Sequence, residues 1–255
     1  MKTRIITAIC IIAVVLYPLL AGGIPLEILA FVVLSGGTYE WLRKESGFSR
    51  WGVPAVLLCI AYIFGARWLL PFHPYAYIAV GILIMLALPV FFESFTVQDS
   101  WAMVTMTVFF ILVWMAFETL CVEPRYIWTI CLATYGSDTG AYFVGRAFGK
   151  HKMNPRISPK KTWEGFAGGL AAGFLLSFGL SFFYGSGLIF KVNFLLCLLC
   201  PMTAEIGDLC FSAIKRSRRQ KDFSRLLPGH GGILDRVDSL LYNIVLFGIL
   251  FQLLG

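Results

Sequence analysis

The chain has 255 residues, of which 58% are hydrophobic and only 14% are charged, and its mean hydropathy is +0.80. A soluble domain carries about 45–50% apolar and about 25% charged residues, so this composition excludes a soluble globular protein. The net charge of +7 is typical of membrane-protein loops that face anionic lipid, and we infer no nucleic-acid partner. Because lipid offers the backbone no hydrogen bonds, we expect an all-α transmembrane helix bundle.

Nine apolar stretches are long enough to cross about 30 Å of hydrocarbon, which takes roughly 17–25 residues each. We expect a polytopic bundle with spans at 5–21, 24–42, 53–70, 74–92, 101–122, 126–147, 163–184, 189–213 and 238–254. The first stretch, preceded by Lys2 and Arg4, also has the form of a signal peptide ending near residues 21–23. Because further spans follow directly, we favour an uncleaved first helix.

The basic residues predict how these spans are oriented. With a cytoplasmic N-terminus, eighteen of the 21 Lys and Arg residues, Lys44 and Arg50 among them, lie on the cytoplasmic side, and only Arg67, Arg125 and Lys191 lie opposite. One span more or fewer would scatter these charges to both sides. We therefore expect a multi-pass protein of the bacterial inner (cytoplasmic) membrane.

Charged residues also divide the chain into two regions. Residues 1–100 predict N-terminal helices with short connections, whereas residues 101–255 hold the long basic loops and the carboxylates within apolar spans. An ionisable group inside the membrane is costly and marks function, so we place the catalytic region at 101–255. The Cys197–Cys200 pair has redox-motif spacing, but no neighbour activates it, and we interpret it as core packing.

The first candidate site begins where the eighth span leaves the membrane. Glu205, Asp208, Ser212, Lys215 and Arg219 recur every three or four residues, so we expect them on one helix face. Asp208 lies seven residues before Lys215, roughly 10 Å deeper at 1.5 Å per residue. An orientation signal does not explain an acid at that depth.

A tight turn is predicted at residues 227–232, where glycines flank His230 and let successive N–H groups point at an anion. The ninth helix opens with Asp235, Arg236 and Asp238, whose two carboxylates share a face. Carboxylates from two helix ends beside Lys and Arg suit a metal–polyphosphate site, since Mg²⁺ is usually held by one or two carboxylates, phosphate oxygens and water. Helix capping and positive-inside charge would explain any one of these residues equally well.

A second polar group lies at residues 134–165. Asp138 precedes Arg146 by eight residues, roughly 12 Å deeper in a helix, so its depth resembles that of Asp208. Lys160 and Lys161 end the following basic loop and suit phosphate groups, although orientation explains either one as well. His151 gains no partner from the sequence. Glycines at 136, 140, 145, 149, 165, 169 and 173 predict close helix packing.

The 203–238 segment resembles the signature of the phosphatidate cytidylyltransferases, or CDP-diacylglycerol synthases. The matching residues are Ser212, Lys215-Arg216, Lys221-Asp222, Pro228-Gly229-His230-Gly231-Gly232 and Asp235-Arg236-Val237-Asp238. Residues 2–4, 39–42, 138–142 and 158–165 are similar as well. Two positions depart from the pattern: Phe211 stands where Glu is common, and Ser224 where Gly is usual. Glu205 would replace the acid missing at position 211.

This resemblance implies transfer of the cytidylyl group of CTP to phosphatidate in the bilayer. Asp208 and Asp235 would hold Mg²⁺, with K⁺ beside it. A phosphate monoester has a second pKa of about 6, so phosphatidate brings its own nucleophile. Catalytic roles are implied for Asp208, Asp235, Lys215, Arg216, Lys221, His230, Arg236 and Asp238, and substrate contacts for Asp138, Lys160, Lys161, Ser212, Asp222, Gly231 and Gly232.

Two other functions stay open at this point. A CTP-dependent polyprenol kinase would also handle CTP and a lipid but would transfer the γ-phosphoryl group. An ion-coupled transporter would explain intramembrane Asp138 and Asp208, although the sequence shows no inverted repeat. A homodimer is a further partnership that the sequence leaves open.

Overall fold

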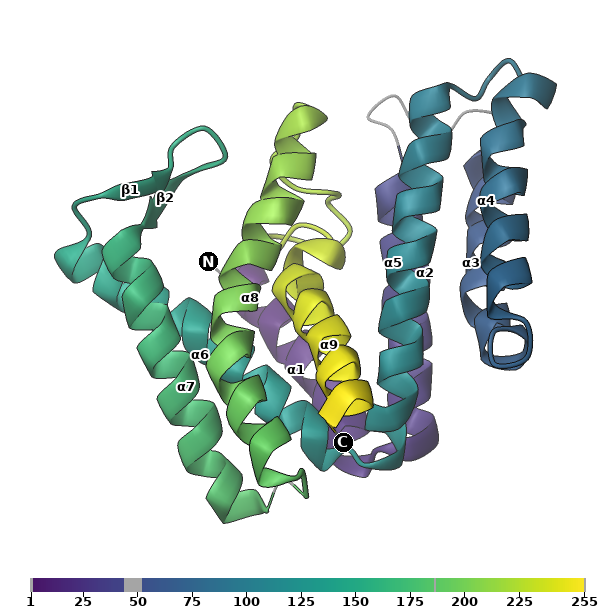
Figure 1. Cartoon of the computed structure of the whole chain (residues 1–255). Coiled ribbons are helices and arrows are strands. Elements are labelled where there is room, and N and C mark those ends of the chain that lie inside the picture. Colours follow the sequence, from purple (N-terminus) through teal and green to yellow (C-terminus); the bar gives the residue numbers. More distant parts are fainter. Residues whose placement is uncertain (1, 44–51, 186, 255) are drawn as a thin grey trace. The chain divides into compact units, whose positions relative to one another are not determined.

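The computed structural model describes residues 2–43, 52–185 and 187–254, except the side chains of 2–6, 8 and 184 (Figure 1). Lys44 and Arg50, used in the predicted orientation, lie outside the described residues, as do the side chains of Lys2 and Arg4. The described helices are α1 (Lys2–Ala21), α2 (Gly23–Leu42), α3 (Gly52–Leu69), α4 (Pro74–Phe91), α5 (Val97–Val122), α6 (Arg125–Phe148), α7 (Trp163–Tyr184), α8 (Phe190–Ser217) and α9 (Leu234–Leu254), and the strands are β1 (Lys152–Asn154) and β2 (Ser158–Thr162).

The all-α prediction is confirmed, and each predicted apolar stretch is helical. Six helices of the described chain are long and apolar enough to cross a membrane, namely α3, α4, α5, α7, α8 and α9. The chain is therefore a multi-pass membrane protein. The predicted spans end too early for α8 and begin too late for α9. Hydropathy excluded the charged residues that occupy the last turn of α8 and the first turn of α9.

Two compact units divide the described residues. Unit 1 comprises the described part of Met1–Glu27 and Ala116–Gly255, and unit 2 comprises the described part of Ile28–Met115. The helix α1 therefore groups with the C-terminal helices. The predicted boundary at residue 100 follows the distribution of charge and not packing, and it stays a prediction.

Helices α6 and α7 of unit 1 pack closely through small residues. A Cβ atom on Gly140 would lie 2.4 Å from the Ala172 Cβ, and one on Gly168 would lie 2.4 Å from the Val144 Cβ. No side chain fits at either position without separating the helices. The glycine prediction is thus confirmed, since close approach of transmembrane helices depends on such residues.

Polar side chains connect α6, α8 and α9 inside unit 1. The Ser137 Oγ donates to the Pro201 carbonyl at 3.1 Å, and the Asn243 Nδ2 donates to the Thr134 Oγ1 at 2.7 Å. Thr203 bonds the same Asn243. Hydrogen bonds of this kind between helices are worth about 0.6 kcal/mol each on average in a membrane, so together they fix the register of the three helices that carry the site.

Unit 1 has one strongly charged end. The Thr7 hydroxyl in α1 donates to the Pro228 carbonyl at 3.1 Å, which places the start of α1 beside the α8–α9 loop. A short antiparallel hairpin of β1 and β2, which the sequence analysis treated as a loop, lies at the adjoining ends of α6 and α7 (Figure 1). We call the region formed by the start of α1, the hairpin, the α8–α9 loop and the first turn of α9 the charged end.

Unit 2 is held mainly by aromatic contacts. The Phe64 ring lies 4.5 Å from that of Phe31 and 4.7 Å from that of Trp114. Tyr62 and Tyr77 stack at 4.3 Å. Acidic and basic side chains are sparse in this unit, so we look for chemistry in unit 1.

Candidate active site

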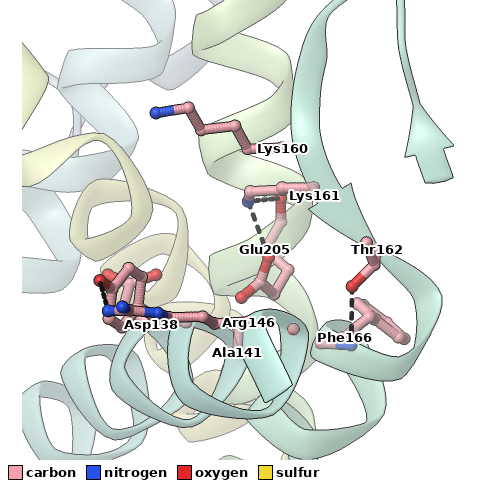
Figure 2. Close-up of a pocket in the computed structure, with 11 residues that line it drawn as sticks. Asp138, Ala141, Arg146, Lys160, Lys161, Thr162, Phe166 and Glu205 are labelled. Atoms are coloured by element: carbon pink, nitrogen blue, oxygen red, sulfur yellow. Dashed lines mark hydrogen bonds and ion pairs between the residues drawn. The ribbon is translucent and has the colours of Figure 1, made fainter. Parts of the chain in front are cut away.

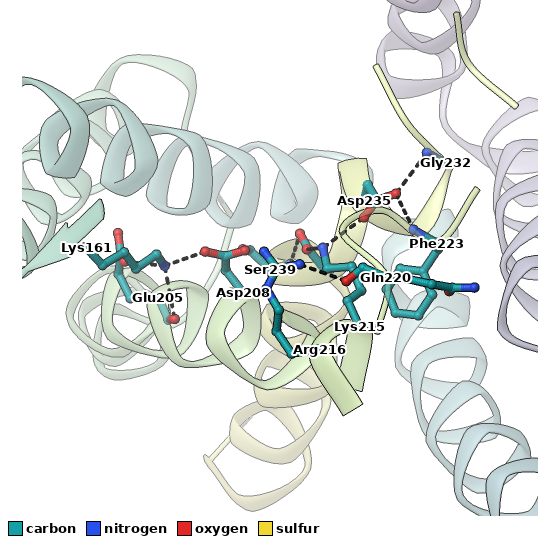
Figure 3. Close-up of polar contacts among 11 residues, drawn as sticks. Lys161, Glu205, Asp208, Lys215, Arg216, Gln220, Phe223, Gly232, Asp235 and Ser239 are labelled. Carbon is teal, nitrogen blue, oxygen red and sulfur yellow. Dashed lines mark hydrogen bonds and ion pairs between the residues drawn. The ribbon is translucent and has the colours of Figure 1, made fainter. Parts of the chain in front are cut away.

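A buried cluster joins the end of α8 to the start of α9 (Figure 3). The Lys215 Nζ lies 2.8 Å from the Asp235 Oδ1 and 3.7 Å from the Asp238 Oδ2. The side chain of Lys215 is 8% exposed and that of Asp235 only 2%. We call Lys215, Asp235 and Asp238 the buried cluster. The structure therefore brings these three predicted residues together, with both carboxylates on one face of α9.

The α8–α9 turn is organised around Asp235. Its Oδ2 accepts hydrogen bonds from the backbone N–H groups of Phe223 and Gly232, each at 2.9 Å. Gly231 has a φ of +84°, and a Cβ there would lie 3.0 Å from the same Oδ2. The predicted tight turn is confirmed, but the Phe223 and Gly232 N–H groups bind a carboxylate of the chain itself.

A second cluster joins the hairpin to α8. The Lys161 Nζ lies 2.5 Å from the Asp208 Oδ2 and 2.7 Å from the Glu205 Oε2. Glu205 is nearly buried, whereas 30% of the Asp208 side chain is exposed. Burial acts to lower the pKa of Lys161, but the nearby Asp208 and Glu205 outweigh it, so the pKa is raised. We call Lys161, Glu205 and Asp208 the hairpin cluster.

In the view of Figure 3, Asp208 lies between the Lys161–Glu205 pair on one side and Lys215 and Asp235 on the other. All five side chains belong to the charged end of unit 1 or to the last turns of α8 below it. Two lysines and their carboxylates thus form one polar zone across the ends of three segments, β2, α8 and α9.

Thr162 places Lys161 in this zone. The Thr162 hydroxyl accepts the Gly165 N–H at 3.1 Å, which caps α7 directly after β2 ends. Such a cap is worth about 1 kcal/mol. Residue spacing could not reveal the Lys161–Glu205 pair, because these residues are 44 positions apart and lie in segments of different type.

Position 211 has a packing role. Phe211 is 1% exposed, and its ring lies 5.9 Å from Phe223 and 6.0 Å from Tyr242. The Lys215 Nζ in turn lies 5.4 Å from the Phe223 ring centroid. At the position where the sequence pattern led us to expect Glu, this chain therefore has an aromatic support for the buried cluster. Glu205 is buried beside Lys161.

A cavity of about 380 Å³ opens between α6, β2, α7 and α8 (Figure 2). It brings together the predicted residues Asp138, Lys160 and Lys161. Arg146, which the sequence analysis treated only as an orientation charge, lies at the same cavity and bonds the Tyr142 hydroxyl at 3.2 Å. The cavity is lined by Asp138, Ala141, Tyr142, Gly145, Arg146, Lys160, Lys161, Thr162, Gly165, Phe166 and Glu205.

The other predicted residues surround these groups. Ser212 is buried on α8 between Asp208 and Lys215. Arg216 donates to the Gln220 carbonyl at 2.8 Å. The Nδ1 of His230 is buried and has no hydrogen-bond partner among the described residues. The predicted residues Lys221, Asp222 and Arg236 are exposed.

Two expectations are corrected. Arg219 does not continue the α8 face, because α8 ends at Ser217 and Arg219 has a left-handed φ of 57°. His151 has a partner after all, since its Nδ1 lies 2.6 Å from the Glu164 Oε1. Glu164 also accepts the backbone N–H groups of Lys150 and His151, so it fastens the hairpin to the first turn of α7.

The carboxylates fit a metal site that a substrate completes. In the part of the chain that the structure describes, no three His, Cys, Asp or Glu side chains are grouped to hold a metal ion. Asp208 is accessible, whereas Asp235 has Oδ1 on Lys215 and Oδ2 on two N–H groups. A metal ion would therefore have to displace Lys215 from Oδ1 to bind Asp235. Mg²⁺ needs only one or two carboxylates when phosphate oxygens and water complete its shell.

Comparison with known proteins gives the class. The model of the Cytidylyltransferase family matches residues 2–254, so the chain belongs to this family of nucleotidyltransferases. The phosphatidate cytidylyltransferase of Staphylococcus epidermidis is 32% identical and aligns with 98% of each chain. That of Bacillus subtilis is 32% identical over 95% of this chain and 94% of its own. That of Staphylococcus aureus is 32% identical over 98% of each. The resemblance seen in the sequence is confirmed.

Proposed function

We propose that the chain is a phosphatidate cytidylyltransferase, which converts CTP and phosphatidate to CDP-diacylglycerol and diphosphate. The observation that carries this proposal is the polar zone around Asp208, where two lysine–carboxylate clusters meet beside a cation-lined cavity. The zone belongs to a chain whose full-length relatives bear that name. The zone itself holds two lysines and four carboxylates, so positive charge for two polyanionic reactants would come from bound cations and from the exposed Lys and Arg residues around it.

The reaction needs positioning more than activation. A phosphatidate oxygen forms a bond to the α-phosphorus of CTP, the bond from that phosphorus to the β-phosphate oxygen breaks, and diphosphate leaves with the electron pair. Phosphatidate is already substantially dianionic near neutral pH, so no side chain has to remove a proton from it. The task of the chain is to hold both reactants in line and to neutralise charge that spreads in the transition state.

Exposed cations provide this neutralisation at the α8–α9 loop. Arg216, Lys221 and Arg236 are exposed at the charged end and would contact the CTP phosphates. Lys215 is already occupied by Asp235 and Asp238, so it would reach a phosphate only after a cation replaces it on Asp235. His230 braces the turn or assists the leaving diphosphate, and Ser212, Asp222, Gly231 and Gly232 complete the binding surface.

Asp208 and Asp235 are the residues that would hold Mg²⁺, with K⁺ beside it. When bound, these cations would neutralise phosphate oxygens and favour the departure of diphosphate. Asp238 would keep Lys215 close to the site after the exchange on Asp235. Asp138 lines the adjoining cavity.

We also propose nine spans, a cytoplasmic N-terminus and an inner-membrane location. The Thr7–Pro228 bond puts the start of α1 at the end that holds the basic hairpin and the α8–α9 loop. At the other end of unit 1, Arg125 bonds the Gly185 carbonyl at 3.1 Å and Tyr126 packs on Phe247. This arrangement agrees with cytoplasmic basic loops. A homodimer is tested by the mass of the detergent-solubilised particle.

The test uses purified protein with Mg²⁺, phosphatidate and CTP labelled either in the base or at the γ-phosphate. We expect base label in a liponucleotide and release of diphosphate. Movement of the γ-phosphate into lipid would instead identify a lipid kinase. Uptake of a solute by proteoliposomes without any lipid product would identify a transporter.

A further inference from the structure

The cavity between α6, β2, α7 and α8 has the character of a site for an amphiphile (Figure 2). Small and aromatic residues such as Ala141, Gly165 and Phe166 form much of its wall, while Arg146 and Lys160 add two positive charges. A site built only for a nucleoside triphosphate would not need this apolar wall. A lipid with a phosphate headgroup matches both parts.

Based on the proposed function, we propose that this cavity binds the phosphate monoester headgroup of phosphatidate, with Arg146 and Lys160 as its contacts. CTP would then approach Asp208 from the α8–α9 loop, on the other side of the polar zone. The assignment therefore gives each substrate its own group of cations. It adds Arg146 to the residues expected to recognise substrate.

The charges in the cavity favour a phosphate at one end of it. Lys161 is already paired with Glu205 and Asp208, whereas no described carboxylate pairs with Arg146 or Lys160. Two cations without acidic partners suit a dianion. Asp138, the acid on the same wall, lies two helical turns before Arg146. The headgroup is thus kept at the Arg146 end.

The surroundings of the cavity suit a lipid that stays in the bilayer. Exposed aromatic residues lie at the charged ends of α6 and α7, namely Tyr142, Phe143, Phe148 and Trp163. Aromatic side chains gather where hydrocarbon meets headgroups. Arg146 and Lys160 therefore lie at the depth of lipid phosphates.

Binding to the full chain in detergent tests this assignment without relying on turnover. The probes are dioctanoyl-phosphatidate, CTP and inorganic phosphate, titrated into the parent, Arg146→Gln and Lys160→Gln. We expect each variant to bind dioctanoyl-phosphatidate about tenfold more weakly, the loss of one charge-assisted contact, and to bind CTP as the parent does. Inorganic phosphate, which cannot use the apolar wall, should bind far more weakly than the lipid.

Two control variants separate recognition from folding. Lys152→Gln removes an exposed charge from the same hairpin but outside the cavity lining, and it should change neither affinity. Arg146→Lys keeps the charge and should restore most of the lipid affinity. Each variant must retain the thermal transition of the parent before its affinities are compared.

Weaker binding of CTP in Arg146→Gln and Lys160→Gln, with lipid binding intact, would assign the cavity to the nucleotide and overturn the proposal. Unchanged affinity for both probes would overturn it as well. If the parent protein binds the lipid through Arg146 but forms no liponucleotide, the proposed function is wrong and the lipid site stands. If the protein makes liponucleotide but neither lipid binding nor turnover depends on Arg146, the proposed function stands and the lipid site is wrong.

Discussion

The two lysine–carboxylate clusters have the same chemistry but different exposure. In the buried cluster, Lys215 and Asp235 are 8% and 2% exposed. In the hairpin cluster, Lys161 and Asp208 are 19% and 30% exposed. A buried ion pair is costly to break because the remaining charge stays uncompensated, whereas an exposed charge is solvated. The buried cluster therefore fixes the geometry of the α8–α9 turn, and the hairpin cluster is where a ligand can intervene.

The largest effect is expected from Asp235→Asn. This change leaves Lys215 with only its longer contact to Asp238, at 3.7 Å, and breaking a buried pair typically costs about 3–5 kcal/mol. It also removes a proposed metal ligand. We expect loss of cytidylyl transfer together with a lower thermal transition, measured by base-labelled CTP and by unfolding in detergent.

Glu123→Gln is the matched control for Asp235→Asn. Glu123 pairs with Arg125 at 2.8 Å, but this pair is exposed at the other end of unit 1, so its loss should leave the thermal transition close to that of the parent. Parent-like stability in Asp235→Asn would show that the buried cluster does not organise the turn. Parent-like turnover would refute its role as a metal ligand.

Asp208→Asn should reduce activity without a comparable loss of stability. The side chain is partly exposed, and Lys161 keeps its second partner, Glu205. We expect transfer to fall by on the order of 10²–10³-fold, as for a group that stabilises transition-state charge. Kinetics and thermal unfolding on the same preparation check this. A fall in activity that merely follows a fall in stability would contradict the contrast between the clusters.

The sequence predicts the helices well because a membrane span needs a long apolar run, which composition alone reveals. It also predicts that Lys215, Asp235 and Asp238 belong to one site, since the motif joins two consecutive helix ends, but it does not predict the ion pairs between them. It misses the hairpin, whose Lys- and Pro-containing strands show no apolar alternation. It misses the partners of Lys161, because packing of β2 against α8 is decided by three-dimensional contacts that no spacing encodes.

Glu205→Gln should have a smaller effect, about tenfold on kcat/KM, because Lys161 keeps Asp208 but loses its buried anchor. Burial lowers the pKa of Lys161, and Asp208 with Glu205 raises it above its ordinary value of 10.5. Removal of Glu205 should therefore move the loss of the ammonium form to lower pH. The pH dependence of kcat/KM measures this shift, and an unchanged alkaline limb would show that Glu205 does not act through Lys161.

Phe211→Leu should have the smallest effect and should act on the buried cluster alone. Leu keeps most of the volume beside Phe223 and Tyr242 but removes both aromatic contacts, which are worth about 0.5–1.5 kcal/mol each beyond burial. Because Phe223 donates its N–H to Asp235 and its ring faces Lys215, the loosened support should lower the thermal transition and reduce kcat less than threefold. The KM for phosphatidate should stay unchanged, since the cavity lining lacks Phe211. If the KM for phosphatidate changed markedly while the thermal transition stayed near that of the parent, the two clusters would act as one unit. The contrast between them would then not hold.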